Sequence, residues 1–222
     1  RQRQMCIRDS PTITTNGVLR PTHLNINLDH ITENFRTIQK QVGRATVMPI
    51  LKANAYGHGL IEVARHLVKQ GAGQFGVAFL EEAILLREAG IKIPILVLGG
   101  ILENQIPLFI QNDLALTASS IEKLQQIDET ASRMGRQAHV HLKIDTGMER
   151  IGVHYYSAEP LLEASLKCKH TSIDGIFSHF ANADAADLTS ARMQLDRFLD
   201  VLKFYERRNI PAPIRHLSLI HI

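Results

Sequence analysis

Short apolar runs alternate with segments of helical periodicity along most of this 222-residue chain, and that alternation limits the folds it can adopt. The runs are near-continuous in apolar character, as expected of parallel strands covered on both faces. The predicted strands span residues 46–51, 75–78, 94–98, 114–117, 138–144, 173–178 and 213–217. Helices are predicted between them at residues 59–70, 81–89, 103–111, 119–133, 159–167 and 190–208. This order of elements indicates the α/β class.

The segment before this alternation carries two further predicted elements. Residues 23–28 (HLNINL) alternate polar and apolar side chains, which predicts a short strand. Asp29 is expected to cap the following helix, which runs to about Val42. Ile31 and Phe35 recur there at helical spacing and would share the face that packs against the core.

Two architectures satisfy this order of elements: a closed (β/α)8 barrel and an open, doubly wound sheet. The motif G-x-G-x-x-G does not follow the first strand, which weakens the dinucleotide-binding version of the open sheet. Distinctive polar residues follow several strands, at Lys52, 145–150 and 178–184, and a barrel gathers such loops at one mouth. We therefore predict a (β/α)8 TIM barrel that is incomplete, since about seven of its eight strands are present. Its two open edges would favour aggregation.

Composition excludes several classes of function. The chain is 45% hydrophobic, so it can bury a sizeable core as one domain. The net charge is +3, of which residues 1–10 supply 3 − 1 = +2, and no basic stripe suited to nucleic acid remains. No apolar run approaches the ~18 residues of a membrane span, and no secretion signal is evident. Cys6 and Cys168 indicate neither a disulfide framework nor a metal site. We expect a cytoplasmic protein without nucleic-acid, membrane or metal partners.

Both ends of the chain differ from the rest. Residues 1–10 (RQRQMCIRDS) have no periodicity and precede a stretch rich in Pro, Thr and Gly at 11–21. The chain then ends abruptly in LSLIHI. We interpret 1–20 and 219–222 as non-native or disordered tails and 21–218 as a barrel domain. The alternative is an ordinary disordered N-terminus and an ordinary final strand.

The most distinctive stretch is ILKANAYGHG at 50–59, which joins a predicted strand to a predicted helix. Lys52 stands at the end of that strand, the end that faces the active site in an α/β barrel. Burial makes an amine a better nucleophile and base, and such a lysine suits Schiff-base chemistry with an aldehyde cofactor. The alternative is a lysine that snorkels to solvent beside a glycine-rich turn.

Two further segments carry candidate site residues. In HLKIDTGMERIGV (141–153), a strand ends in Lys143 and Asp145, and the next loop presents Arg150. Arginine is the side chain best suited to bind a carboxylate through two parallel hydrogen bonds, although an ion pair with Asp145 is the alternative. In SHFANADA (178–185), His179 follows an apolar strand and is expected at the barrel mouth. Its alternative is a histidine hydrogen-bonded within the core.

These segments resemble the alanine racemase family of fold-type III pyridoxal-phosphate enzymes. LKANAYGHG is similar to the family's cofactor-lysine motif, and the K-x-D-T-G-M-x-R and H-F-A-x-A-D segments are also similar. The resemblance implies pyridoxal 5'-phosphate as cofactor, with Lys52 both binding it and acting in catalysis. It further implies that Tyr56 holds the phosphate, that His179 lies against the cofactor ring and that His216 supports the site indirectly.

On the substrate side, the resemblance implies that Arg150 orients the substrate carboxylate. It also implies that Lys143 can be carbamylated, so that its new negative charge holds the arginine. Glu149 departs from the pattern, because a glycine is usual there, and its carboxylate could compete for Arg150.

The implied activity is the interconversion of L- and D-alanine by a cytoplasmic homodimer that supplies D-alanine for peptidoglycan. Inversion needs two bases on opposite faces of Cα. Lys52 would be one, and the other would be a tyrosine of a C-terminal β domain, contributed across the dimer interface. The match fails at Leu219 and Ile220, so we expect this chain alone to be inactive. The alternatives are a racemase of serine, lysine or broad specificity, and a non-catalytic pyridoxal-phosphate-binding barrel.

Overall fold

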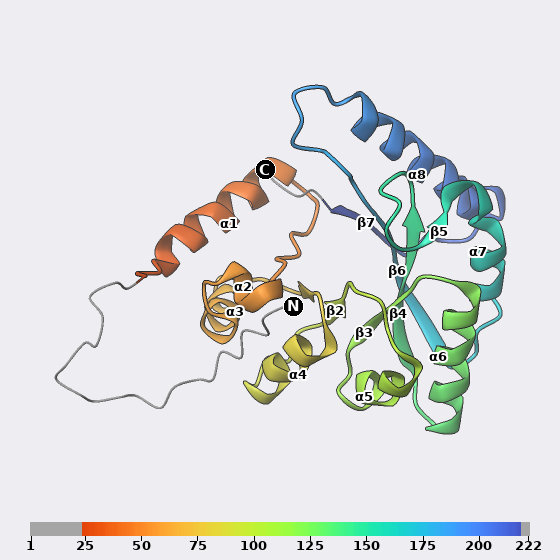
Figure 1. The fold of residues 1–222 in the computed structure, drawn as a ribbon, viewed down its shortest axis with the longest axis horizontal. Coiled ribbons are helices and arrows are strands. Elements are labelled where there is room, and N and C mark those ends of the chain that lie inside the picture. The colour runs from red at the N-terminus through yellow and green to blue at the C-terminus, as the bar shows by residue number, and fades with distance from the viewer. Residues whose placement is uncertain (1–23, 219–222) are drawn as a thin grey trace, which may run out of the picture.

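A computed structural model of the protein describes residues 24–218, which form an α/β half-barrel (Figure 1). The sheet has the order β1-β2-β3-β4-β6-β7 with parallel neighbours, and the short β5 pairs with β4. The strands are β1 (Phe75–Val77), β2 (Ile95–Val97), β3 (Ala115–Ala118), β4 (Ala138–Asp145), β5 (Val153–His154), β6 (Thr171–His179) and β7 (Ile214–Ser218). The predicted α/β class and incomplete barrel are therefore confirmed.

Helices connect the strands and pack along the sheet, as the sequence predicts. They are α1 (Leu28–Val42), α2 (Lys52–Tyr56), α3 (Leu60–Lys69), α4 (Leu80–Glu88), α5 (Ile106–Gln111), α6 (Ile121–Arg133), α7 (Glu159–Ser165) and α8 (Thr189–Arg207). Two short 3-10 turns, η1 (Glu103–Gln105) and η2 (Tyr155–Ser157), precede α5 and α7. The sequence did not indicate β5 or η2. In the described part of the chain, no helix combines the length and apolar character that a membrane crossing needs.

Apolar side chains fill the packed layer between helices and sheet, and four phenylalanines are among the largest of them. Phe75 of β1, Phe109 of α5, and Phe198 and Phe204 of α8 are all fully buried. Burying such a side chain stabilises the fold by roughly 1.5–3 kcal/mol, which makes this layer the main source of stability.

The predicted strand at 23–28 is wrong for the residues described. Residues 24–27 form no strand, and α1 already begins at Leu28. Asn27, not Asp29, caps the helix: its Oδ1 accepts hydrogen bonds from the backbone N–H groups of Asp29 (2.8 Å) and His30 (3.4 Å). The side-chain cap satisfies N–H groups that a helix start leaves free, so the helix begins earlier than expected.

The predicted strand at 46–51 is reduced to one isolated bridge between Ile50 and Gly76. Gly76 donates to the Pro49 carbonyl (2.9 Å), and Leu51 donates to the Gly76 carbonyl (2.7 Å). Proline has no N–H, so the ladder cannot continue past Pro49. The segment still runs alongside β1 and delivers Lys52 to the same end of the sheet as the other strands.

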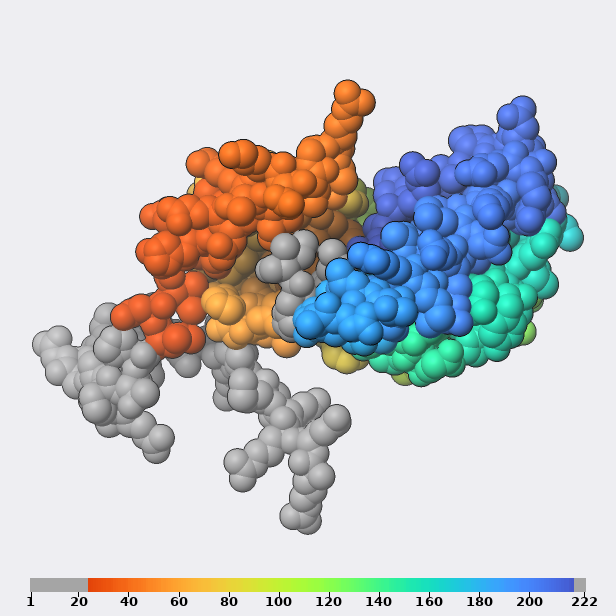
Figure 2. Space-filling model, turned by 90° about the horizontal axis from the view of Figure 1, so that it is seen from above, coloured from red at the N-terminus to blue at the C-terminus, as the bar shows by residue number. Residues whose placement is uncertain are grey.

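The two ends of the curved sheet lie apart. In Figure 1 and in the space-filling view of Figure 2, the orange segment with α1 and the blue segment with α8 lie at opposite ends of the molecule. Among the described residues, no strand pairs with the outer edge of β7, where Ile214 is 56% exposed. The predicted tails at 1–20 and 219–222 lie outside the described residues, and the domain boundaries stay predictions.

Candidate functional site

The predicted site residues gather at the carboxyl ends of the parallel strands. Lys52 follows the Ile50 bridge, Lys143 lies near the end of β4, and His179 ends β6. Burial, together with the positive charges of Arg150, Lys143 and Lys52, lowers the pKa of His179 to about 4. These three cations therefore share one electrostatic neighbourhood with His179, whose imidazole is neutral at pH 7.

Lys52 opens a turn whose backbone is left-handed at successive positions. Ala53, Asn54, Ala55 and Tyr56 have φ angles between 52° and 58°. This conformation costs a residue other than glycine roughly 1–2 kcal/mol, so other contacts must hold the turn. Asn54 provides one of them, because its Oδ1 accepts a hydrogen bond from the Leu60 N–H (2.8 Å) at the start of α3. We call residues 52–58 the Lys52 turn.

The Lys52 turn brings an amine and a phenol together. Lys52 is partly buried, and its Nζ lies 5.8 Å from the centroid of the Tyr56 ring. Tyr56 is 59% exposed, so its hydroxyl is open to a ligand from solvent. The left-handed backbone decides this pairing, because it curls the chain back within four residues.

Lys143 is buried beneath the loop that follows its own strand. It is 3% exposed, and its Nζ donates to the Ile144 carbonyl at 2.8 Å. Gly152 crosses closely above it: a Cβ there would lie 2.8 Å from the Lys143 carbonyl oxygen. Burial lowers the pKa of Lys143 to about 8, against the opposing effect of Asp145. A larger fraction of this amine is neutral than of an exposed lysine.

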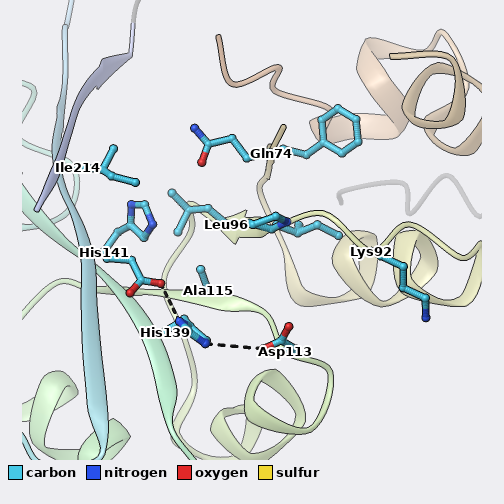
Figure 3. A pocket seen from close by; sticks show the side chains of 12 residues that line it. Gln74, Lys92, Leu96, Asp113, Ala115, His139, His141 and Ile214 are labelled. Atoms are coloured by element: carbon cyan, nitrogen blue, oxygen red, sulfur yellow. Dashed lines mark hydrogen bonds and ion pairs between the residues drawn. The ribbon is translucent and has the colours of Figure 1, made fainter. Parts of the chain in front are cut away.

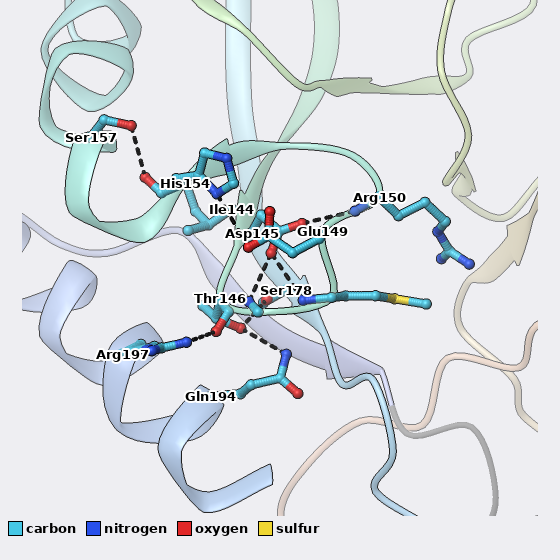
Figure 4. A network of polar contacts seen from close by, with 12 residues as sticks. Ile144, Asp145, Thr146, Glu149, Arg150, His154, Ser157, Ser178, Gln194 and Arg197 are labelled. Carbon is cyan, nitrogen blue, oxygen red and sulfur yellow. Dashed lines mark hydrogen bonds and ion pairs between the residues drawn. The ribbon is translucent and has the colours of Figure 1, made fainter. Parts of the chain in front are cut away.

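Residues 145–150, the Asp145 loop, are organised by the Asp145 carboxylate (Figure 4). It accepts hydrogen bonds from the backbone N–H groups of Gly147 (2.7 Å), Met148 (3.0 Å) and Arg150 (3.2 Å). Burial alone would raise the pKa of Asp145, but the loop N–H groups and the Lys143 charge lower it overall. The carboxylate thus binds the backbone of Arg150, and the guanidinium extends away from it (Figure 4).

Glu149 does not lie against Arg150. Its Oε1 is 3.7 Å from His154 Nδ1, and its φ of 56° is in the left-handed region. That φ favours glycine, the residue usual at this place in the family that the sequence resembles. Asp145, Glu149 and His154 come close enough to share a metal ion, within 4.8 Å. Asp145 already uses both oxygens to hold its loop, so this cluster is explained without a metal.

A buried hydrogen-bond network behind the loops was missed by the sequence reasoning (Figure 4). Gln194 of α8 is 0% exposed; its Oε1 accepts from the Ala181 N–H (3.0 Å), and its Nε2 donates to the His179 carbonyl (3.1 Å). The hydroxyls of Thr146 and Ser178 are 2.7 Å apart, and Arg197 donates to the Thr146 carbonyl at 2.9 Å. We call these four side chains (Thr146, Ser178, Gln194 and Arg197) the Gln194 network. A polar residue on the apolar face of α8 is the signal that could have found it.

His216 of β7 pairs with a second histidine, His141 of β4. Its Nε2 is 2.8 Å from His141 Nδ1, and its ring stacks on Phe177 at 4.7 Å between centroids. Burial lowers the pKa of His141 to about 4 and that of His216 to about 3, each with smaller contributions from neighbouring charges. The pair is neutral and packs beside Lys143, so it can support the site only from behind.

A separate cavity of about 370 Å³ opens at the amino ends of the strands (Figure 3). Its polar wall is His139, whose Nδ1 is 2.7 Å from Asp174 and whose Nε2 is 3.8 Å from Asp113. Neither Lys52, Arg150 nor His179 lines it. The candidate catalytic residues therefore meet at the opposite end of the sheet from this cavity.

Comparisons with known proteins agree with one another. Residues 26–219 match the family model described as "Alanine racemase, N-terminal domain". The chain is 43% identical over 202 residues to "Alanine racemase 2" of Caldanaerobacter subterraneus subsp. tengcongensis, covering 90% of this chain and 52% of that protein. It is 40% identical over 200 residues to an alanine racemase of Carboxydothermus hydrogenoformans, and the match covers 90% of this chain and 54% of that protein. The chain spans about half the length of the curated relatives that it matches.

Solved structures give the same picture. Alanine racemase of Clostridium difficile 630 in complex with cycloserine superposes with a TM-score of 0.86 at 33% identity, covering 91% of this chain and 56% of that one. Histidine racemase of Leuconostoc mesenteroides subsp. sake also superposes, with a TM-score of 0.78 at 26% identity. That superposition covers 87% of this chain and 51% of the histidine racemase.

Proposed function

The chain belongs to the alanine racemase family, and from that premise we propose that it is the cofactor-binding barrel of an enzyme that interconverts L- and D-alanine. One observation carries the proposal: Lys52, Lys143, Arg150 and His179 lie at or just after the carboxyl ends of parallel strands, where barrel enzymes hold their active sites. The motif ILKANAYGHG supplies Lys52 at that point.

The residues present fit pyridoxal 5'-phosphate. Lys52 offers the amine that an aldehyde requires, and the exposed phenol of Tyr56 nearby can donate to a phosphate oxygen. His179 is neutral at pH 7, so its ring can lie against the cofactor without charge. When bound, the cofactor delocalises the negative charge that proton removal leaves on the substrate Cα.

Arg150 is the group that we assign to the substrate carboxylate. Its side chain is exposed, and only its backbone N–H is tied to Asp145. The guanidinium can therefore form the two parallel hydrogen bonds that a carboxylate accepts. We assign a supporting role to Lys143: its neutral amine can add carbon dioxide and release a proton, and the resulting carbamate would hold Arg150 in place.

Lys52 is the base that we assign to one face of Cα. Its amine takes the proton on that face, and inversion needs a second group on the other face. We propose that this group is a tyrosine of a C-terminal β domain, contributed across a homodimer interface. In this proposal the enzyme is cytoplasmic and supplies D-alanine for peptidoglycan.

A racemase of another amino acid is the second candidate. The likeness to a histidine racemase favours it, because that fold superposes with a TM-score of 0.78 at 26% identity. Serine, lysine and broad-specificity racemases belong to the same alternative, and a non-catalytic cofactor-binding barrel is the candidate outside enzymes.

Cofactor trapping and product analysis test these candidates together. The protein encoded by the complete reading frame is incubated with pyridoxal phosphate, reduced with borohydride and digested for peptide mapping. We expect the label on Lys52 and D-alanine as the main product from L-alanine. A label on Lys143 or another lysine would overturn the site assignment. Faster turnover of serine, lysine or histidine than of alanine would assign the enzyme to a different amino-acid substrate. Trapping of the cofactor without turnover of any amino acid would favour the non-catalytic cofactor-binding barrel.

A further inference from the structure

Glu82 of α4 contacts the Lys52 turn from a distant part of the chain. Its Oε1 accepts a hydrogen bond from the backbone N–H of Ala53 at 2.6 Å, across 29 residues of sequence. Its Oε2 accepts from the backbone N–H groups of Ala78 (2.9 Å) and Phe79 (3.2 Å). One carboxylate thus joins the end of β1, the start of α4 and the residue that follows Lys52.

The remaining backbone hydrogen bonds of the Lys52 turn are local. Ala55 donates to Leu51, Gly57 donates to Ala53 and Asn54, and His58 donates to Ala55. Such contacts stabilise a left-handed turn internally. The Leu51 N–H bond to Gly76 ties the residue before Lys52 to β1, and Glu82 ties the residue after it. The Ala53 N–H belongs to the peptide unit that directly follows the Lys52 Cα. A bond at this donor therefore sets where the lysine side chain begins.

We propose that Glu82 is a positioning residue for Lys52: it anchors the strained turn to β1 and so places the amine at the candidate site. The effect of Glu82 on cofactor binding by Lys52 rests on the proposed function. The anchoring of the turn by Glu82 does not. Glu82 also lies in the first turn of α4, where a carboxylate caps a helix and interacts favourably with its dipole. A helix cap would need only the hydrogen bond from the Phe79 N–H. The hydrogen bond from the Ala53 N–H therefore distinguishes a positioning role from a capping role.

Glu82→Asp separates those roles, because it keeps a carboxylate in the first turn of α4 but shortens the side chain by one methylene. Glu82→Gln removes the charge at almost the same size. Glu81 provides the matched control: it is the preceding residue of the same helix, it is exposed, and its carboxylate lies outside this set of hydrogen bonds. Glu81→Asp and Glu81→Gln therefore make the same chemical changes without touching the turn.

Hydrogen–deuterium exchange without cofactor is the first measurement. We expect exchange at residues 52–58 to rise about tenfold in both Glu82 variants, as for one lost hydrogen bond to a charged group, with α4 still protected in Glu82→Asp. The Glu81 variants should match the wild type. Far-UV circular dichroism confirms that each variant is folded. Unchanged exchange at 52–58 in both Glu82 variants would overturn the proposal and leave Glu82 as a helix cap.

The rate at which borohydride-trappable cofactor accumulates on Lys52 is the second measurement. We expect it to fall about tenfold in Glu82→Asp and to stay unchanged in Glu81→Asp. Faster exchange with unchanged trapping would overturn the positioning role. If the wild type traps no cofactor at all, the proposed function fails, and exchange at residues 52–58 still decides whether Glu82 anchors the turn.

Discussion

The Lys52 turn and the loops after β4 and β6 approach the candidate site from two sides, and they are held by different means. In the Lys52 turn, four successive residues adopt left-handed backbone angles, and Tyr56 is 59% exposed. Behind the other loops, Thr146, Ser178 and Gln194 are all 0% exposed and hydrogen-bonded to one another or to loop backbone. A few surface contacts thus hold the strained Lys52 turn in position, whereas a buried polar network holds the loops after β4 and β6.

This difference has a consequence for stability and motion. A buried polar network is costly to break, because any partner left alone loses its hydrogen bond without gaining water. A strained surface turn can instead relax into solvent once one anchor is removed. We therefore expect the Asp145 loop and His179 to remain in place under conditions in which the Lys52 turn rearranges.

The largest expected effect is that of replacing Arg150, which lies on the Asp145 loop beside the buried network. Arg150→Lys loses the planar, two-pronged contact with a carboxylate and should lower kcat/KM about a hundredfold, or ~3 kcal/mol. Steady-state kinetics of the complete enzyme measures it, with Arg192→Lys on the exposed face of α8 as control. Unchanged kinetics would show that the arginine serves the loop structure alone.

Gln194→Met tests the buried side directly. The variant keeps the length of the side chain but leaves the His179 carbonyl and the Ala181 N–H without a partner. We expect the free energy of unfolding to fall by about 2 kcal/mol, measured by urea denaturation. Gln125→Met, on an exposed position of α6, should change it by less than about 0.5 kcal/mol. Equal effects of the two changes would contradict the network's role.

Acid should weaken the β4–β6–β7 side. Burial lowers the pKa values of His141 and His179 to about 4 and that of His216 to about 3, from 6.5. Between pH 6.5 and about 4, the unfolded chain therefore binds protons that the folded chain does not, and stability is lost as the pH falls. For buried His141 alone, the loss approaches ~1.4 kcal/mol per pH unit in that window. His141→Asn should flatten the slope of unfolding free energy against pH, whereas exposed His30→Asn should not.

Glu149→Gly gives the smallest expected effect. Glycine adopts the observed φ of 56° without a Cβ clash, although it also gains more freedom in the unfolded chain. The balance should raise the free energy of unfolding by up to about 1 kcal/mol, as measured by thermal and urea melts. Lys92→Gly, at a loop position with no comparable φ, should not stabilise the protein. A clear loss of stability in Glu149→Gly would mean that its contact with His154 matters more than the strain.

Local patterns indicated much of the fold and of the candidate site. Helical spacing gives α3, α6 and α8 to within about two residues. Lys52, Arg150 and His179 were identified from short segments at strand ends, and the structure brings them to one end of the sheet. Two local interpretations were wrong: Pro49 interrupts the predicted strand at 46–51, and Asn27, not Asp29, caps α1.

The sequence by itself determined the order of strands and helices and the polar residues at the strand ends, because periodicity and short motifs are properties of neighbouring residues. Only the tertiary structure decided which distant groups meet. Glu82 reaches Ala53 across 29 residues, Gln194 reaches Thr146 across 48, and His141 pairs with His216 across 75. Each of these contacts depends on how distant strands, helices and loops pack together, and the first depends also on the left-handed backbone of the Lys52 turn. No local pattern specifies such a contact, because its energy arises only when the fold brings both partners together.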